Sequence, residues 1–479
     1  MVAARLSATL KPRLADFDFL NSCYLSPIRR SPTGPMMNRA LRLLSFVLPL
    51  AMAVEANGAD LQEIYRMAQA ADAQYAAARA AWSAGQEKLP QGLSGLLPSA
   101  TVSASSQYND REIRSRDPAT ATTTSQFNSN AASISVTQPL YRPQNFTVYD
   151  QAKSQVVQSD AVFAQAAQDL LLRVAQAYFD VLLAQDTIVF AQAQLVAIGR
   201  QLEQAKRNFE VGTATITDTH EAQSRYDLTV SLEITAKNDL EIRKRFLELI
   251  IGRPAPGISP LGPRFSPRFP EPNNPVAWVD DAGVNNLQVR ASQAGLEFAA
   301  KEVERNRAGH RPTLDAFATY TDSGSGAGTV GIAGVDTKAG VVGVQLAIPI
   351  YQGGLTSSRV REALANEEKA RQDLENARRT AQLTAQQTFL GVASGVSQVR
   401  ALEAALVSSQ SSLDSTRLGQ EVGVRTVIDV LNAQQQLSQT RRDLAQAKYN
   451  YILSLLRLKA AAGQLTEQDV ALVNGWLDR

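Results

Sequence analysis

The segment that decides the fold of this 479-residue chain is Glu210-Val-Gly-Thr-Ala-Thr-Ile-Thr-Asp218, which returns as Glu421-Val-Gly-Val-Arg-Thr-Val-Ile-Asp429. The two copies lie 211 residues apart, and seven of the fourteen positions that start at Glu210 and at Glu421 are identical without a gap. Solenoid repeats are far shorter, at roughly 20–50 residues. The sequence therefore predicts a tandem duplication of one domain-sized unit.

The first 53 residues read as an N-terminal extension and a signal peptide. Arg39 and Arg42 precede the apolar run 43–53, which ends in a small-x-small cleavage signal and is too short to span a membrane. Without this segment the chain is slightly acidic, which gives no indication of nucleic-acid binding. Its only cysteine, Cys23, is removed as well, so we expect no disulfide, no thiolate metal site and no lipidated N-terminal cysteine. The chain is expected to be exported.

Proline placement indicates long helices. No proline occurs between Pro143 and Pro254 or after Pro349, and prolines cluster in 254–275. Within the first gap two seams repeat every seven residues, which predicts coiled-coil packing. They are Val174, Val181, Ile188, Leu195, Leu202 and Phe209, and Ala177, Ala184, Ala191, Ile198 and Ala205.

Ahead of each long helix the pattern alternates with a period of two, as in a strand with lipid on one side and water on the other. The predicted apolar faces are Val102, Ala104, Ser106 and Tyr108; Ile134 and Val136; Leu314, Ala316, Ala318 and Tyr320; and Val342, Val344, Leu346 and Ile348. Four strands cannot close a barrel with a lumen, and a lipid-exposed sheet edge is not tolerated. We therefore expect three chains to supply twelve strands.

After residues 1–53 the resulting organisation has four segments. Residues 54–253 form the first repeat, 254–283 a Pro-rich connector, 284–465 the second repeat, and 466–479 a tail. The first repeat is expected to hold a short helix, strand 99–108, outer loop 109–130, strand 131–140, long helix 144–209, turn 211–213 and return helix 214–252. The second repeat is expected to hold helix 284–307, strand 312–321, outer loop 322–339, strand 340–349, long helix 354–419, turn 422–424 and return helix 425–462.

On these motifs the chain resembles the TolC family of outer-membrane efflux and secretion ducts. The resemblance is carried by the two Val-Gly turns with their aspartates, by Leu97-Pro-Ser and Arg311-Pro-Thr, and by Gln138-Pro-Leu-Tyr141 and Ile348-Pro-Ile-Tyr351. It implies a homotrimer, with a twelve-stranded outer-membrane β-barrel continued by a coiled-coil tunnel in the periplasm. It also implies a passive duct that works with a periplasmic adaptor and an inner-membrane ABC or proton-driven transporter. The exported cargo, polypeptide or small toxic molecule, stays open.

The resemblance also implies roles for residues at the helical tips. It places adaptor docking at Val211, Gly212, Thr213, Val422, Gly423 and Val424, and an entrance gate at Asp218, Arg425 and Asp429, with Arg425 paired to Asp218. Two positions depart from the family pattern: Gln420 stands where a latch tyrosine is frequent, and Asn432 where a second acidic ring is frequent. A single ring of carboxylates puts tight cation binding at the entrance in doubt.

A soluble periplasmic coiled-coil adaptor or scaffold is the alternative, because such proteins also contain long helical hairpins. An enzyme is not expected. The two histidines, His220 and His310, have no metal-ligand spacing, and Gly324-x-Gly326-x-Gly328 lacks the Gly-Lys-Ser/Thr of a phosphate loop. No cofactor is predicted.

Overall fold

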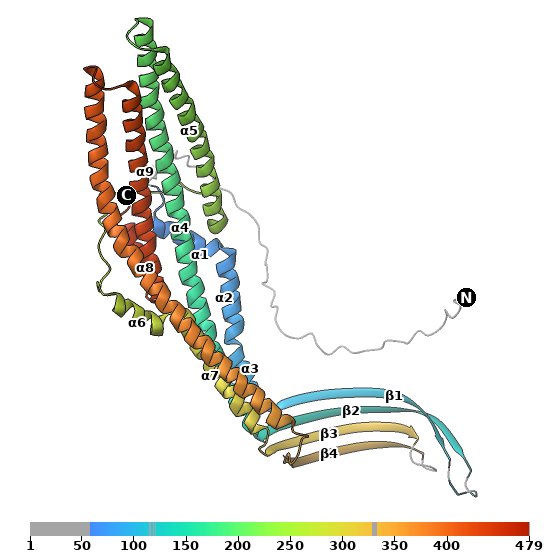
Figure 1. Ribbon diagram of the computed structural model, residues 1–479. Helices are drawn as coiled ribbons and strands as arrows, with labels where there is room; N and C mark the ends of the chain where they lie inside the picture. The colour runs from blue at the N-terminus through green and yellow to red at the C-terminus, as the bar shows by residue number, and fades with distance from the viewer. Residues whose placement is uncertain (1–57, 115, 118, 120, 328–332, 479) are drawn as a thin grey trace, which may run out of the picture. The chain divides into compact units, whose positions relative to one another are not determined.

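The computed structural model describes residues 58–478 except 115, 118, 120 and 328–332, so the predicted signal peptide lies outside the described residues. Ten helices and four strands are described, in the order helix, sheet, helix in each repeat (Figure 1). The helices are α1 Leu61–Ala71, α2 Ala73–Gln86, α3 Lys88–Ser94, α4 Pro143–Glu210, α5 Ile216–Ile251, α6 Pro275–Asn285, α7 Leu287–Ala308, α8 Leu355–Glu421, α9 Val427–Ala461 and α10 Glu467–Asn474. The strands are β1 Ser99–Ile113, β2 Thr123–Tyr141, β3 Thr313–Ala327 and β4 Ala333–Ala347.

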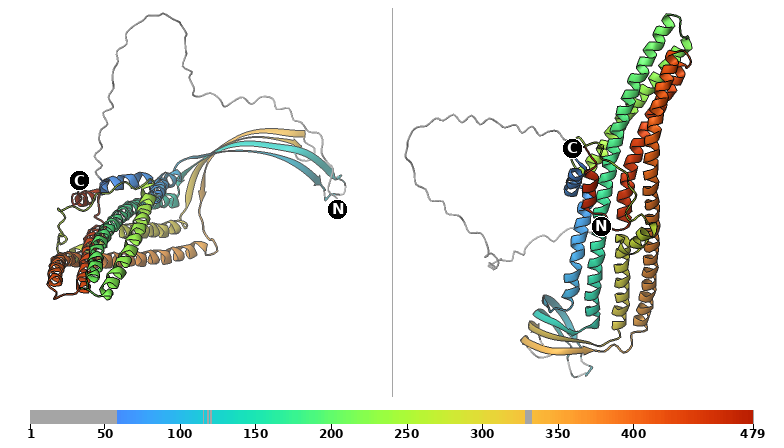
Figure 2. Two further views of the ribbon diagram at one scale, coloured as in Figure 1. Left: turned by 90° about the horizontal axis from the view of Figure 1, so that it is seen from above. Right: turned by 90° about the vertical axis from the view of Figure 1, so that its left-hand side faces the viewer.

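The two long helices, α4 and α8, contain 68 and 67 residues. At 1.5 Å per residue each is about 100 Å long. Each turns back into a return helix, and the α4–α5 and α8–α9 hairpins run side by side (Figures 1 and 2). Nearer the sheet, α2 and α7 replace the return helices as neighbours of α4, and α7 also packs on α8. One described helix, α4, is long and apolar enough to cross a membrane, but it packs against α5, α7 and α9 as a coiled coil would.

The heptad seams explain this packing. All five members of the alanine-rich seam of α4 are buried, whereas the other seam is buried at Val174, Val181 and Leu202 and becomes exposed at Phe209. Small side chains allow close helix approach, so the alanine seam faces the neighbouring helices along most of its length. The main core lies midway along the helices, where Tyr178, Phe179 and Val396 meet α1, α9 and the connector.

The sheet has the order β1-β2-β3-β4, with every neighbouring pair antiparallel. Its register brings the predicted apolar residues to one face, since Val102 pairs with Ile134 and Ile134 with Tyr320. The opposite face is rich in hydroxyl groups: Thr101, Ser103, Ser105, Ser133, Ser135, Thr137, Thr319, Thr321, Ser323 and Thr337. The Ser103 and Ser133 hydroxyls are 2.8 Å apart, and those of Ser135 and Thr319 are 3.2 Å apart.

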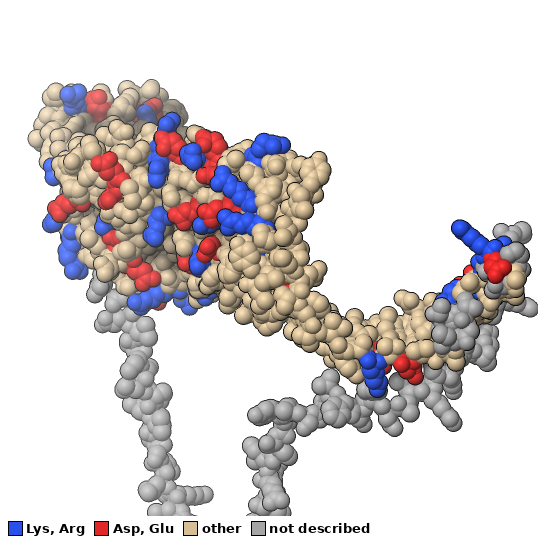
Figure 3. Space-filling model, turned by 90° about the horizontal axis from the view of Figure 1, so that it is seen from below, with Lys and Arg blue, Asp and Glu red and all other residues tan. Residues whose placement is uncertain are grey.

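Charged side chains are distributed unevenly between the helices and the sheet. Lys, Arg, Asp and Glu are interspersed over the helices, and few of them appear along the middle of the sheet (Figure 3). Several apolar side chains of the sheet are exposed in one protomer, with Val102 at 73% and Val342 at 86%. An exposed apolar face of this kind is what lipid contact requires. Among the described residues the outer edges of β1 and β4 are unpaired, so the sheet is open on both sides.

Several predicted boundaries were wrong. The strands are longer than expected, because the Ser, Thr, Asn and Gly residues of the predicted outer loops 109–130 and 322–339 continue the backbone pairing. The predicted short N-terminal helix is three helices, interrupted at Asp72 and Glu87. Helix α6 begins inside the predicted connector and ends at Asn285, beyond it. The tail contains α10, whose Val470 and Val473 are buried in the core.

Candidate channel entrance

The two hairpin turns have the same backbone conformation. Gly212 has φ of 79° and Gly423 has φ of 81°, the left-handed region that favours glycine. In the first turn the carbonyl of Asn208 accepts hydrogen bonds from the amides of Thr213 and Ala214, and in the second the carbonyl of Gly419 accepts them from the amides of Val424 and Arg425. The sequence repeat is therefore a repeat of turn geometry.

Asp218 and Asp429 both belong to capping boxes at the start of the return helices. The Asp218 carboxylate accepts from the Thr215 amide at 3.0 Å and the Thr215 hydroxyl at 2.8 Å. The Asp429 carboxylate accepts from the Thr426 amide at 2.9 Å and the Thr426 hydroxyl at 3.0 Å. In return each threonine hydroxyl accepts from the aspartate amide at 3.2 Å. The aspartates thus satisfy backbone donors that a helix start leaves free.

The charge of Asp429 is stabilised locally. The hydrogen bonds from the Thr426 amide and hydroxyl, together with the nearby positive charge of Arg425, lower the pKa of Asp429 below its ordinary value. The carboxylate is consequently ionised throughout the neutral range. Arg425 is exposed, and its aliphatic stem lies over Gly419, where a Cβ would be 2.7 Å from Arg425 Cγ.

The structure does not bring all predicted gate residues together within one protomer. In the described part of the chain, no ion pair joins Arg425 to Asp218. Gln420 contributes its backbone carbonyl, which accepts from the Gly423 amide at 3.1 Å. Asn432 is exposed and accepts a 3.4 Å hydrogen bond from Arg225.

Arg225 is a tip residue that the sequence reasoning missed. Its Nε donates to Glu221 at 3.1 Å in α5, and its Nη1 donates to Gln435 at 2.8 Å in α9. The 211-residue offset makes Glu221 and Asn432 equivalent positions in the two repeats, and Arg225 donates hydrogen bonds to both. The Glu221–Arg225 spacing of four residues was the available signal, but such pairs are common on any helix surface.

Two small apolar clusters hold the ends of the hairpins. Ile198, Leu202 and Ala205 of α4 meet Ala222 of α5 and Leu431 of α9. A second cluster, which joins α8 to α9, contains Leu413, Val430 and Leu437. The first cluster crosses between the hairpins, so the two tips pack on each other directly.

The residues predicted to dock an adaptor are solvent-exposed at the ends of the hairpins. Val211 is 73% exposed, Val422 is 65% exposed and Val424 is 78% exposed. Gly212 and Thr213 of the first turn and Gly423 of the second are exposed as well. Each tip thus exposes at least one apolar side chain, and adaptor docking there stays a prediction.

Comparison with known proteins supports the resemblance to the TolC family that the sequence motifs indicate. The sequence profile of the family described as outer membrane efflux protein matches residues 55–253 and 278–464, one segment for each repeat. The chain is 33% identical over 420 residues to the outer membrane protein TolC of Vibrio cholerae, an alignment that covers 87% of this chain and 94% of the relative. It is also 33% identical over 446 residues to the alkaline protease secretion protein AprF of Pseudomonas aeruginosa, with 91% of each chain covered.

Solved structures show the same fold. The outer membrane protein VceC of Vibrio cholerae has a TM-score of 0.71 at 16% identity, with 84% of this chain and 96% of that chain covered. The CmeC outer membrane channel of Campylobacter jejuni has a TM-score of 0.71 at 16% identity, covering 87% of this chain and 90% of that chain. The alternative of a soluble adaptor is not supported, because the match extends over the strands as well as the helices. The chain belongs to the outer membrane efflux protein family and is an outer-membrane exit channel.

Proposed function

We propose that the channel is the passive duct of a tripartite export system and that it opens at the tips of its two hairpins. The architecture supports this: an open four-stranded sheet with an apolar face leads directly into helices about 100 Å long. Three copies supply twelve strands and close the edges that one copy leaves unpaired. A periplasmic adaptor and an inner-membrane transporter complete the system, and the barrel face contacts outer-membrane lipid.

The proposed gate consists of Asp218, Arg425 and Asp429, with Gln420 and Asn432 beside them. Asp429 supplies one ring of three carboxylates in the trimer, held at fixed positions by the capping boxes. Arg425 extends from the turn with no ion-pair partner in its own chain among the described residues, so we assign its partner, Asp218, to the neighbouring protomer. Charge-assisted hydrogen bonds across this seam keep the entrance closed.

The adaptor docks on the exposed valines of the two turns. Because the turns share one backbone conformation, a single adaptor motif can engage both of them. The relatives named TolC and alkaline protease secretion protein AprF lead us to propose that the cargo includes secreted polypeptides or small toxic molecules.

Planar-bilayer conductance of the purified trimer tests the gate. Wild type is expected to form stable channels of small conductance, and Asp429→Ala and Arg425→Ala are expected to raise that conductance. His220→Ala is the control, because His220 is exposed near the same tip and has no assigned role. Equal conductance for wild type, Arg425→Ala and Asp429→Ala would overturn the gate, and a protein that never inserts would overturn the duct.

A further inference from the structure

A cavity of about 380 Å³ lies where the connector between the repeats meets α6, α9 and α10. Its lining comes from connector residues between 264 and 271, from Trp278 of α6, from α9 and α10, and from Trp476 just beyond α10. It lies at the end of α9 that is remote from the tip, and the proposed duct gives it no role. Its volume is that of a small-ligand pocket.

Two buried aromatic side chains form part of the wall. Trp278 is 4% exposed and Tyr451 is 2% exposed. The indole nitrogen of Trp278 donates to the carbonyl of Pro272 at 2.9 Å. The Tyr451 hydroxyl accepts from the Arg268 amide at 2.9 Å and donates to the Arg268 carbonyl at 2.8 Å. The connector backbone thus satisfies the polar atoms of both side chains, and their remaining surface is apolar.

The polar part of the cavity contains a largely buried ion pair. Lys459 of α9 donates to Oδ1 of Asp469 in α10, a residue that is 9% exposed. The other oxygen of Asp469 accepts from the Thr466 amide at 2.9 Å and from its hydroxyl at 3.2 Å. Both carboxylate oxygens therefore have partners. The Lys459 ammonium has three donors, of which this pair uses one among the described residues.

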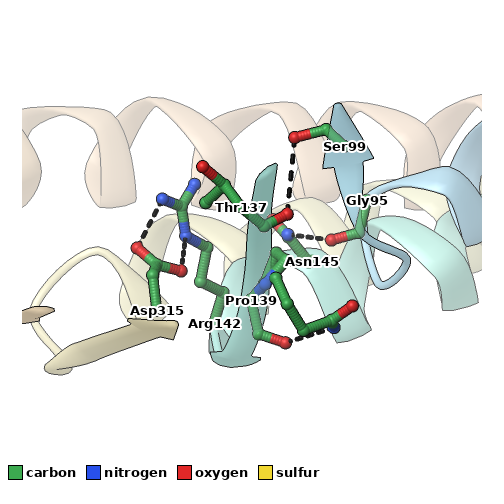
Figure 4. A network of polar contacts seen from close by, with 8 residues as sticks. Gly95, Ser99, Thr137, Pro139, Arg142, Asn145 and Asp315 are labelled. Carbon is green, nitrogen blue, oxygen red and sulfur yellow. Dashed lines mark hydrogen bonds and ion pairs between the residues drawn. The ribbon is translucent and has the colours of Figure 1, made fainter. Parts of the chain in front are cut away.

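Two connector arginines in the lining have no partner for their charge. Arg264 and Arg268 are exposed, and in the described part of the chain their guanidinium groups form no ion pair or hydrogen bond. Arg142 shows the contrasting arrangement. Its guanidinium donates from Nε to Asp315 Oδ1 at 2.7 Å and from Nη2 to Asp315 Oδ2 at 2.6 Å, so it is fully engaged within the chain (Figure 4).

The lining has a surplus of positive charge. Glu271 and Asp469 are its two carboxylates, against three cations, although the chain beyond residue 53 is slightly acidic. A guanidinium group binds a carboxylate through two parallel hydrogen bonds. Positive charge beside buried aromatic side chains therefore favours a ligand with a flat apolar body and one anionic group. A cationic ligand would be repelled, and a neutral one would leave the arginines without a partner.

We propose that this cavity binds a small aromatic anion. The ring of the ligand lies against Trp278 and Tyr451, and its anionic group lies on Arg264 and Arg268. A ligand in this position joins the connector to α9 and stabilises the folded channel. The inference does not depend on the gate or on adaptor docking, because residues of one protomer form the whole lining described above.

Fluorine NMR with a fluorinated naphthoate tests the proposal on the purified channel in lipid nanodiscs. Binding broadens the signal of the probe, and empty nanodiscs measure the part that is due to lipid. Wild type is expected to bind the naphthoate saturably. It is expected to bind the matching neutral naphthalenemethanol about tenfold more weakly, because the charge-assisted hydrogen bonds are lost, and not to bind the matching naphthylmethylammonium.

Removal of the two unpaired charges tests the anionic half of the site. Arg264→Gln combined with Arg268→Gln is expected to weaken naphthoate binding about tenfold. Arg253→Gln is the matched control, because Arg253 is an exposed arginine just before the connector that does not line the cavity. All three side chains are exposed, so we expect both variants to fold, and circular dichroism melting checks this.

Filling the cavity tests the apolar half. Leu472 of α10 lines the cavity and is 49% exposed, so Leu472→Trp is expected to occupy the space of the ring and abolish binding. Ala471→Trp is the control, since Ala471 is exposed on the same helix and lies outside the lining. The naphthoate is also expected to raise the melting temperature of wild type and of Ala471→Trp, but not that of Leu472→Trp.

Absence of saturable naphthoate binding to wild type would overturn the proposal, as would equal affinity for the naphthoate and the neutral alcohol. Undiminished binding in the double arginine variant or in Leu472→Trp would place the probe elsewhere on the channel and would overturn it too. If the probe binds as expected while Asp429→Ala leaves the conductance unchanged, the gate is rejected and this site is retained.

Discussion

The hydroxyl of Tyr449 in α9 donates a 2.6 Å hydrogen bond to Oδ2 of Asp186 in α4. This bond joins the return helix of the second repeat to the long helix of the first, beside a cavity of about 350 Å³ that Arg441 and Lys448 also line. Burial raises the pKa of Asp186, and the hydrogen bond from Tyr449 offsets part of that effect. The protonation state of this half-buried carboxylate is therefore coupled to the packing of α9 on α4.

Asp186→Asn is expected to change how stability depends on pH. A carboxyl whose pKa is higher in the folded than in the unfolded chain favours folding at pH values below the unfolded pKa, and this contribution is lost as pH rises through the folded pKa. The stability of the variant relative to wild type should therefore rise as pH increases above the unfolded pKa of an aspartate, about 4. Melting curves followed by circular dichroism measure this, with Asp180→Asn as a control on the same helix. A variant that loses stability relative to wild type over that range would contradict the assignment.

Asp72→Ala is expected to destabilise the middle of the helical part. Asp72 is 5% exposed, accepts from Arg173 at 2.9 and 3.0 Å, and caps α2 through the Tyr75 amide at 2.6 Å. Breaking a buried pair costs about 3–5 kcal/mol, and the one-third exposure of Arg173 brings our expectation to about 2–3 kcal/mol. Denaturant unfolding measures the loss. Asp150→Ala is the control, because its pair with Lys153 is exposed.

The contribution of Asp72 to stability is expected to depend on pH in the opposite direction to that of Asp186. Burial alone would raise the pKa of Asp72, but the hydrogen bonds from Arg173 and Tyr75 outweigh it and lower the pKa. Its contribution is present above the unfolded pKa and is lost as pH falls through the folded pKa. The difference between wild type and Asp72→Ala should consequently shrink in strong acid, and a constant difference would contradict the assignment.

Removal of a capping box should loosen one tip without unfolding the chain. Thr426→Ala takes away the hydroxyl that bonds the Asp429 amide at 3.2 Å, at a cost of about 1 kcal/mol. Hydrogen exchange in 425–433 is expected to accelerate while exchange around Phe389 in the main core stays unchanged. Thr235→Ala is the control, since its hydroxyl bonds only a carbonyl within α5. Equal acceleration in both variants would exclude a capping effect.

Gly423→Ala should impair adaptor binding through the backbone. With φ at 81°, an alanine here costs about 1–2 kcal/mol, although no atom lies within 4 Å of the added Cβ. The turn is expected to change its backbone conformation and to displace Val422 and Val424. Binding of the cognate adaptor to immobilised channel is expected to weaken, and Gly257→Ala is expected to bind as wild type does. Unimpaired binding would place the docking surface elsewhere.

The long helices were predictable because their signals are local and redundant. Proline is absent, heptads persist over many turns, and Gly212 and Gly423 mark the ends. The alternation of strands such as 99–108 was equally clear. The ends of the strands were not predictable. Outside the apolar band both faces of the sheet are polar, and only the backbone hydrogen bonding continues, as at Glu112 opposite Thr124. The small helix α10 was missed because eight residues hold too few turns to show a period.

The tips were predictable in position but not in contacts. The capping role of Asp218 follows from the Thr-x-x-Asp spacing, which was visible at Thr215. The bridge from Arg225 to Asn432 was not visible, since it depends on how two hairpins distant in sequence lie against each other. The Arg142–Asp315 pair joins residues 173 positions apart and was invisible for the same reason.

The hydroxyl-rich face of the sheet has a consequence for the molecules that pass through the barrel. A hydroxyl both donates and accepts hydrogen bonds, so a wall of Ser and Thr exchanges partners with whatever passes as readily as water does. Between Asp315 at one end and Arg111 at the other, this face presents no ionisable side chain to a passenger of either sign. We therefore expect this part of the lining not to select by charge, which would leave that selection to the machinery that loads the duct.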